Sequence, residues 1–174
     1  GNPLVMVSDN GPAFVSDLTE AASAFYGYRH ARILPYNAQA NGTAEARLLT
    51  DERRLARSMG SQRLKDFTSG RHSAHIAQRL LGLDEQPVLR VDRSPLWPLG
   101  QCGSISHCRE WAFAGVSTRF RSIGVDIETI KRVTPKLHGA LFRPDEIAAL
   151  QAQPDTAAAI VFSAKEAGYK AIFP

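Results

Sequence analysis

Apolar positions near the N-terminus form short strand-like and helix-like patterns. PLVMVSD is an apolar run that ends in polar residues, which is typical of a buried strand running out into a loop. In DLTEAASAFYG, apolar residues recur at helical spacing from Leu18 to Phe25, Asp17 and Glu20 are placed like a capping box, and Gly27 follows. ARILPYN favours a second strand or extended segment, and NAQANG has turn composition. We therefore expect strand, helix and strand in this part.

From about residue 48 the pattern becomes a mixture of helices and strands. We expect helices over TDERRLARSM and SGRHSAHIAQRLLG, capped by Thr50 and Ser69, the second ending at Gly82. Strands are predicted at PVLRVD, EWAFAGVST and SIGVDIETI. Two more helices are expected over RPDEIAALQA, with Pro144 at its first position, and over DTAAAIVFSAKEAGYKAIF, which Asp155 begins. This mixture predicts an α/β (α+β) fold class.

Composition narrows the class of protein. The hydrophobic share of 44% and charged share of 22% are typical of a soluble globular protein, and no apolar run is long enough to cross a bilayer. Cys102 and Cys108 form neither a CxxC pair nor a disulfide framework, so we expect free thiols in a reducing cytoplasm.

The net charge of +4 lies in the second part of the chain. Residues 1–47 contain three basic and four acidic residues, and residues 48–174 contain 18 and 13. A mildly basic part suits an anionic partner such as a phosphorylated cofactor or an acidic protein, although a solvated surface is the simpler interpretation. The excess is too weak to indicate nucleic-acid binding by itself.

Asp9 and Glu45 are candidate metal ligands with 35 residues between them. Taken alone, the first is better interpreted as a turn residue and the second as a helix-dipole carboxylate. The segments SDNGPAF and PYNAQANGTAEA, however, closely resemble the end of the catalytic core of insertion-sequence transposases and retroviral integrases. That resemblance implies that Asp9 and Glu45 are the second and third acids of a metal-binding triad for phosphodiester chemistry. The first acid of the triad has no counterpart in the sequence.

Two motifs in the second part contain paired charges. In GVDIE, Asp126 and Glu128 are two residues apart on a predicted strand, so both side chains project from the same face. Mg²⁺ between them would relieve their repulsion. Gly124 before them permits the close approach of a backbone or ligand. In FSAKEAGYK, Glu166 and Lys170 are four residues apart on one helical face. The simpler interpretations are a polar sheet edge and a surface ion pair.

Two further patterns involve histidine. In GSISHC, small residues including Ser106 leave backbone N–H groups and hydroxyls open to an anion, with His107 beside them. A structural imidazole is the simpler interpretation of His107. His72 and His75 are three residues apart on a predicted helix and could chelate a metal. No third ligand is evident, so a solvated helix face is the better interpretation of that pair.

Taken in order, SGRHSAHIAQRLLG, PLWPLGQCGSISHC, IGVDIE and FSAKEAGYKAIFP resemble 4′-phosphopantetheinyl transferases, from about Leu48 to Pro174. The subgroup resembled serves siderophore and nonribosomal peptide synthesis and is typified by the enterobactin synthase component. The resemblance implies a cytoplasmic enzyme that moves 4′-phosphopantetheine from coenzyme A to a serine of an acyl or peptidyl carrier protein, with Mg²⁺. It also implies a fold of two α/β halves, related by a pseudo-twofold axis, with the active site between them.

The same resemblance assigns roles to residues. Asp126, Glu128 and Glu166 would bind Mg²⁺ against the pyrophosphate of coenzyme A. Glu166 would also help to deprotonate the incoming serine, and Lys170 would contact the phosphates. The other cofactor-binding residues implied are Arg71 near the 3′-phosphate and Ser106 and His107 at the pyrophosphate.

We therefore predict two segments joined by a gene fusion. Residues 1–46 would be the C-terminal part of an integrase-core-like domain with a partial RNase H-like fold. Residues 47–174 would be a phosphopantetheinyl transferase-like domain truncated at its C-terminus, because family members continue for some tens of residues after the last helix. Its pseudo-twofold fold would then be incomplete. Membership of the family therefore does not by itself predict that this chain is active. Two alternatives stay open: a catalytically incomplete transposase fragment, and a reading frame without selected function.

Overall fold

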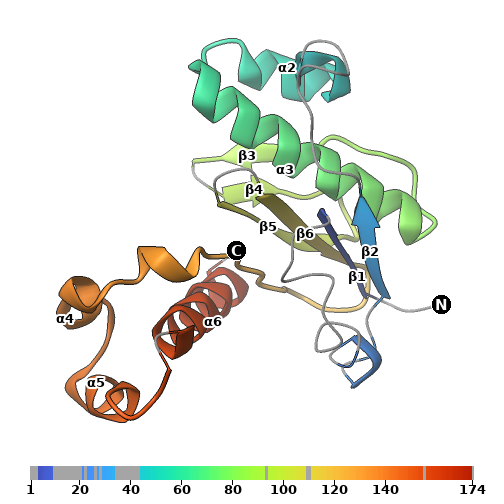
Figure 1. The fold of residues 1–174 in the computed structure, drawn as a ribbon. Helices are drawn as coiled ribbons and strands as arrows, with labels where there is room; N and C mark the ends of the chain where they lie inside the picture. Colours follow the sequence, from blue (N-terminus) through green and yellow to red (C-terminus); the bar gives the residue numbers. More distant parts are fainter. Residues whose placement is uncertain are drawn as a thin grey trace.

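The computed structural model describes residues 4–9, 21, 23–25, 27, 29–33, 44–92, 94–108, 111–154 and 156–173. They form a lobe built on a sheet and a helical lobe nearer the C-terminus (Figure 1). The predicted α/β class is confirmed. Of the first predicted helix, residues 21 and 23–25 are helical, and its capping residues Asp17 and Glu20 lie outside the described residues.

A four-stranded sheet forms the first lobe, in the order β2-β1-β6-β5. Its strands are β1 (Leu4–Asp9), β2 (Arg29–Ile33), β5 (Cys102–Cys108) and β6 (Trp111–Ser117). β1 runs parallel to β2 and antiparallel to β6, and β6 is antiparallel to β5, an edge strand. The predicted strands at PLVMVSD and EWAFAGVST are confirmed. One sheet therefore contains strands from both sides of the predicted boundary after residue 46.

Helix α3 (Ser61–Leu80) covers one face of this sheet (Figure 1). Its small residues Ala74 and Ala77 are fully buried, and Ala77 packs with Val5 of β1 and Val116 of β6. The predicted start at Ser69 is wrong, because α3 begins eight residues earlier. The Ser69 hydroxyl instead donates to the Lys65 carbonyl one turn back, at 3.0 Å, as serine does inside helices.

Helix α2 (Thr50–Ala56) precedes α3. Thr50 is its first residue and not its cap, because the cap position is occupied by Leu49. The free Leu49 N–H is satisfied by Glu52, whose Oε2 accepts it at 3.0 Å. After α3, Gly82 has a positive φ of 80°, as expected of a glycine that ends a helix. β3 (Leu89–Val91) and β4 (Ser94–Leu96) then form a separate two-stranded sheet.

The second lobe contains short helices packed on a long one. Its elements are η3 (Ile130–Arg132), η4 (Pro135–Leu137), α4 (His138–Leu141), α5 (Pro144–Leu150) and α6 (Thr156–Ile172). Val133, Phe142, Ala158 and Ala159 form its buried core. Pro144 is the first residue of α5, as predicted.

The predicted strand over SIGVDIETI is wrong, because residues 122–129 adopt no regular secondary structure. No described strand pairs with them, and a strand needs a neighbour for its backbone hydrogen bonds. The segment instead links the two lobes and packs against α6. Cys102 and Cys108 are free, as predicted, and burial raises the pKa of both thiols. Among the described residues, no helix combines the length and apolar character that crossing a membrane requires.

Candidate active site

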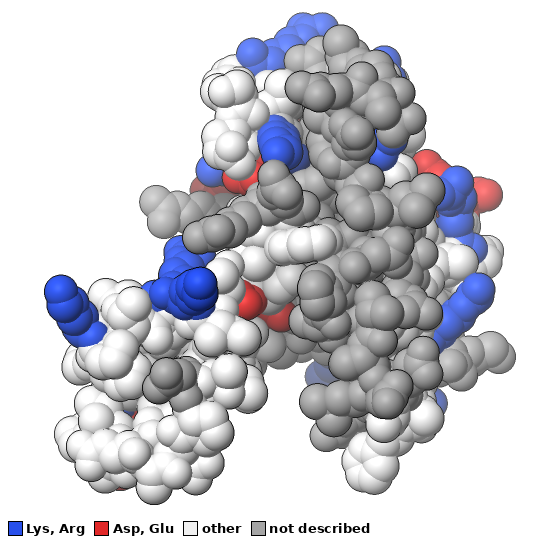
Figure 2. Space-filling model, viewed as in Figure 1, with Lys and Arg blue, Asp and Glu red and all other residues white. Residues whose placement is uncertain are grey.

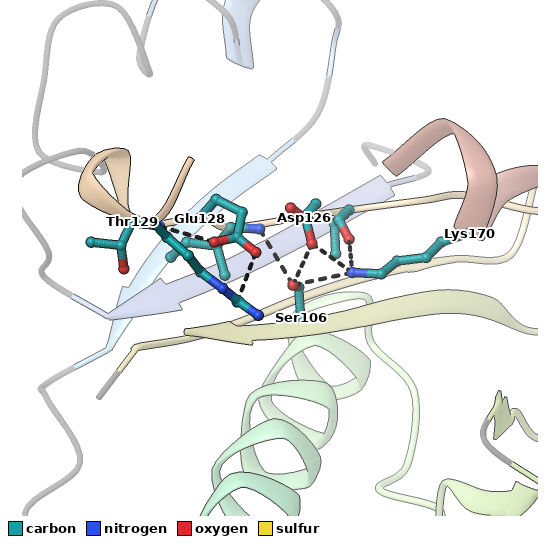
Figure 3. Close-up of polar contacts among 8 residues, drawn as sticks. Ser106, Asp126, Glu128, Thr129 and Lys170 are labelled. Atoms are coloured by element: carbon teal, nitrogen blue, oxygen red, sulfur yellow. Dashed lines mark hydrogen bonds and ion pairs between the residues drawn. The ribbon is translucent and has the colours of Figure 1, made fainter. Parts of the chain in front are cut away.

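The edge strand β5 presents two different chemical surfaces. Successive residues of a strand project to opposite faces, so Ser106 and His107 point apart. Ser106 is 6% exposed and turns away from α3 (Figure 3), whereas His107 lines a cleft on the α3 side. GSISHC is thus a strand paired with β6 and not the open anion nest that its composition suggested. The two residues predicted to share a pyrophosphate site lie on different faces.

Ser106, Asp126 and Lys170 form a polar cluster on the face opposite α3 (Figure 3). Lys170 Nζ lies 2.6 Å from Asp126 Oδ1 and 3.2 Å from Ser106 Oγ. Ser106 Oγ donates to Asp126 Oδ1 at 2.8 Å and accepts from the Ile127 N–H at 3.3 Å. The side chains of Asp126 and Lys170 are 5% and 29% exposed. Three motifs that are distant in the sequence therefore meet at one partly buried ion pair.

A close backbone contact holds this cluster together. A Cβ atom on Gly124 would overlap the carbonyl oxygen of Ala167 and lie 2.8 Å from the Ala171 nitrogen. The first residue of GVDIE is glycine because the backbone of α6 occupies the space of a side chain. Lys170 Nζ also donates to the Val125 carbonyl at 3.2 Å. The predicted close approach at Gly124 is confirmed, with helix α6 as the approaching group.

The other two predicted metal ligands are placed differently. Glu128 Oε1 lies 3.0 Å from Arg132, and its Oε2 accepts the N–H of Thr129 at 3.2 Å. Glu166 is one helical turn before Lys170, half-buried, and no described residue forms an ion pair or hydrogen bond with it. Figure 2 shows acidic side chains in the recess between the lobes, with basic side chains beside them. Opposing charges thus gather at the junction of the lobes.

The carboxylates fit a hard cation in chemistry, although they do not surround one position. Asp126 Oδ2 is buried and has no hydrogen-bond partner among the described residues, which leaves one oxygen available to a cation. Within the same part of the chain, no three His, Cys, Asp or Glu residues are grouped closely enough to hold a metal ion. Lys170 supplies the positive charge beside Asp126 in this arrangement. The residue types are therefore suitable, and binding of Mg²⁺ by Asp126, Glu128 and Glu166 stays a prediction.

A cationic cleft of about 420 Å³ lies on the other face of β5. Arg63, Arg71, Arg90 and His107 line it together with the ring of Phe67. Arg71 is buried, and its guanidinium lies 4.4 Å from the centre of the Phe67 ring. Burial lowers the pKa of Arg71 to about 10, so it remains a cation at neutral pH. A surface of this kind suits an anion attached to a flat or apolar group.

Glu52 and His75 form a buried pair that the sequence reasoning missed. Glu52 is 0% exposed and His75 2%, and Glu52 Oε1 lies 2.9 Å from His75 Nε2. The interpretation of His75 as part of a solvated helix face is wrong, and this bond occupies one of the two ring nitrogens that a metal could bind. The available signal was the spacing of Arg71, His75 and Gln78, which places three polar residues on one buried face of α3.

Asp9 and Glu45 lie in two elements of the first lobe. Asp9 is the last residue of β1, and Glu45 belongs to η2 (Ala44–Arg47). The side chains of both lie outside the described residues. Their pairing around a metal therefore stays a prediction.

Comparison with known proteins identifies the family of the larger part of the chain. The family model for the 4′-phosphopantetheinyl transferase N-terminal domain matches residues 51–117. The model for the 4′-phosphopantetheinyl transferase superfamily matches residues 122–174. Residues 51–174, which carry the polar cluster and the cationic cleft, belong to the 4′-phosphopantetheinyl transferase family. Neither match includes residues 1–50, so the resemblance of residues 1–46 to integrase cores stays a prediction.

Individual relatives agree with this assignment. The chain is 38% identical over 129 residues to 4′-phosphopantetheinyl transferase PptT of Mycobacterium tuberculosis, covering 69% of this chain and 55% of the relative. It is 39% identical over 120 residues to enterobactin synthase component D of Salmonella typhi, covering 66% and 50%. It is 35% identical over 130 residues to 4′-phosphopantetheinyl transferase Npt of Nocardia iowensis, covering 71% and 58%. The chain spans about half the length of the curated relatives it matches.

Proposed function

We propose that this chain binds coenzyme A and transfers its 4′-phosphopantetheine group to a serine of an acyl or peptidyl carrier protein. The observation that carries the proposal is the cluster of Ser106, Asp126 and Lys170, because it brings three separate family motifs to one place. The relatives' names support the reaction, and one of them is a component of enterobactin synthase. The proposed partner is a cytoplasmic carrier protein of siderophore or nonribosomal peptide synthesis.

The two faces of β5 suggest how coenzyme A is held. The cleft containing Arg71, Arg90 and His107 suits the 3′-phosphate and the nucleotide, because cationic donors bind phosphate through charge-assisted hydrogen bonds. Ser106 and Lys170, on the opposite face, suit the pyrophosphate. The cofactor would then cross the free edge of β5. This arrangement places His107 with the nucleotide and separates it from the pyrophosphate contacts.

The proposed transfer needs a nucleophile, a base and charge neutralisation. The carrier serine oxygen forms a bond to the phosphorus attached to pantetheine, the bond from that phosphorus to the bridging oxygen breaks, and 3′,5′-ADP leaves. Glu166, half-buried and without a described partner, accepts the serine proton. Lys170 neutralises negative charge on the phosphates. Mg²⁺ bound by Asp126, Glu128 and Glu166 would stabilise charge on the leaving phosphate.

The direct test is modification of an apo carrier protein. The purified chain is incubated with coenzyme A, Mg²⁺ and an apo peptidyl carrier protein, and the carrier mass is followed over time. We expect a mass gain of one phosphopantetheine group, a gain about 10²- to 10³-fold slower in Lys170→Met, and no change in Lys136→Met, a control at an exposed position outside the site. A carrier that gains no mass, under conditions in which a full-length relative modifies it, contradicts the proposal.

A further inference from the structure

Glu52 is a buried carboxylate with a complete set of hydrogen-bond partners. Its Oε1 accepts the Val88 N–H at 2.8 Å and lies 2.9 Å from His75 Nε2. Its Oε2 accepts the Leu49 N–H at 3.0 Å. A buried charge is tolerated only when its oxygens are bonded in this way. The carboxylate therefore fixes three backbone and side-chain groups at one position.

The Val88 peptide connects Glu52 to the cationic cleft. Its N–H is held by Glu52, and the carbonyl of the same residue accepts Arg71 Nε at 2.6 Å. Arg71 Nη2 donates to the neighbouring Leu89 carbonyl at 2.9 Å. These two bonds use one edge of the guanidinium, which has five N–H donors in all. The Nη1 group has no acceptor among the described residues and remains available to a ligand in the cleft that Arg71 lines.

We infer that Glu52 is a positioning residue for coenzyme A, which acts through the Val88 backbone to aim the guanidinium of Arg71 at the 3′-phosphate. Glu52 is absent from the lining of the cleft, so its effect on the ligand passes through the segment that Arg71 grips. The carboxylate also supplies a counter-charge to Arg71, beside the repelling charge of Arg90. This inference rests on the proposed function, because it assumes that the cleft binds the nucleotide end of coenzyme A.

A purely structural residue and a positioning residue differ in what their loss changes. Loosening the fold weakens the binding of coenzyme A and of 3′-dephospho-coenzyme A alike. Misplacing Arg71 weakens only the ligand that carries the 3′-phosphate. The ratio of the two dissociation constants therefore isolates positioning from stability.

The experiment measures both dissociation constants by isothermal titration calorimetry on the full chain. We expect the parent chain to bind coenzyme A about tenfold or more tightly than 3′-dephospho-coenzyme A, the scale of one charge-assisted hydrogen bond. In Glu52→Gln the ratio should fall towards one, whereas Glu85→Gln, which removes an exposed carboxylate paired with Arg79, should keep it. In an Arg71→Lys background, Glu52→Gln should change the ratio no further.

Each other outcome has a defined meaning. An equal loss of affinity for both ligands, or an additional effect of Glu52→Gln in the Arg71→Lys background, overturns the positioning role. If Glu52→Gln does not fold, His75→Gln replaces it, because that change alters one partner of Glu52 and leaves the carboxylate in place. A parent chain that modifies the carrier but binds both ligands equally overturns this inference alone. A parent chain that binds neither ligand and modifies no carrier overturns the proposed function as well.

Discussion

Replacing Gly124 by alanine should separate the two lobes at the candidate active site. The new Cβ would overlap the Ala167 carbonyl oxygen and lie 2.8 Å from the Ala171 nitrogen, where ordinary contact begins at 3.4 Å. Both groups are helix backbone, so no side-chain rotation relieves the overlap. Helix α6 or residues 122–129 must move by at least 0.6 Å to satisfy the Ala171 contact alone.

That movement is large compared with the tolerance of the Lys170 contacts. Lys170 Nζ is 3.2 Å from both the Val125 carbonyl and Ser106 Oγ, so a shift of this size takes these contacts beyond hydrogen-bonding range. Overpacking costs about 1–3 kcal/mol, and a hydrogen bond to a charged group contributes about 1.5–3 kcal/mol. Because these effects overlap, we expect a loss of about 3 kcal/mol in the free energy of unfolding.

Urea unfolding and carrier modification measure this effect. The midpoint of Gly124→Ala should fall by about 1 M or more, given typical urea dependences of about 1–3 kcal/mol per M. The rate of carrier modification should fall with it, because Lys170 loses its contacts with Ser106 and the Val125 carbonyl. Gly168→Ala is the matched control on α6: nothing lies within 4 Å of its new Cβ, and alanine favours a helix by about 0.5–1 kcal/mol. A Gly124→Ala protein with the parent's midpoint and rate would refute this reasoning.

Three further predictions follow from single side chains. Glu52→Ala should lower the free energy of unfolding by about 3–5 kcal/mol in urea titrations, because it leaves buried partners unpaired, whereas Glu85→Ala removes a surface pair and should cost less than about 1 kcal/mol. Lys170→Met should slow carrier modification about 10²- to 10³-fold in a mass assay, the effect of removing one donor to developing charge; a rate near that of the parent contradicts it. Burial, with smaller contributions from neighbouring cations, lowers the pKa of His72 from the usual 6.5 to about 4. Between these two pH values the unfolded state binds a proton that the folded state does not bind. The free energy of unfolding should therefore fall as the pH falls from 6.5 to 4. His72→Gln should flatten that part of the urea-midpoint profile, and an unchanged profile argues against it.

Local patterns predicted elements whose stability depends on nearby residues. Helix α5 begins at Pro144 as expected, and α6 covers the apolar stretch after Asp155, because capping and helical spacing are written in consecutive residues. The start of α3 was predicted too late because Ser69 has the composition of a cap but uses its hydroxyl inside the helix. The segment containing Asp126 alternates like a strand, yet strand formation depends on a partner elsewhere in the chain.

The sequence indicated which residues belong to the candidate site better than it indicated how they are arranged. The family resemblance assigned Ser106, Asp126 and Lys170 to one active site, and these residues are in contact in the structure. The division of Ser106 and His107 between two faces follows from β5 being a strand, which its small residues did not suggest. The helical spacing on α3 indicates a buried polar face but not its partner Glu52, because residues 75 and 88 are distant from Glu52 in sequence.

Strand β1, from the segment predicted to be integrase-like, pairs with β6 of the transferase-like segment. β6 lies between β1 and β5, and Val5 of β1 stands opposite Val116 of β6. These two valines are 1% and 0% exposed and pack with Ala77 of α3. What β6 requires at this side is a backbone ladder and an apolar residue in the right register, and both are generic properties of strands. Strand β1, which lies in the segment predicted to be integrase-like, can therefore complete this sheet through these generic properties alone. The hydrogen-bonded sheet continues across the predicted boundary at residue 46, and the integrase-like origin of residues 1–46 stays a prediction.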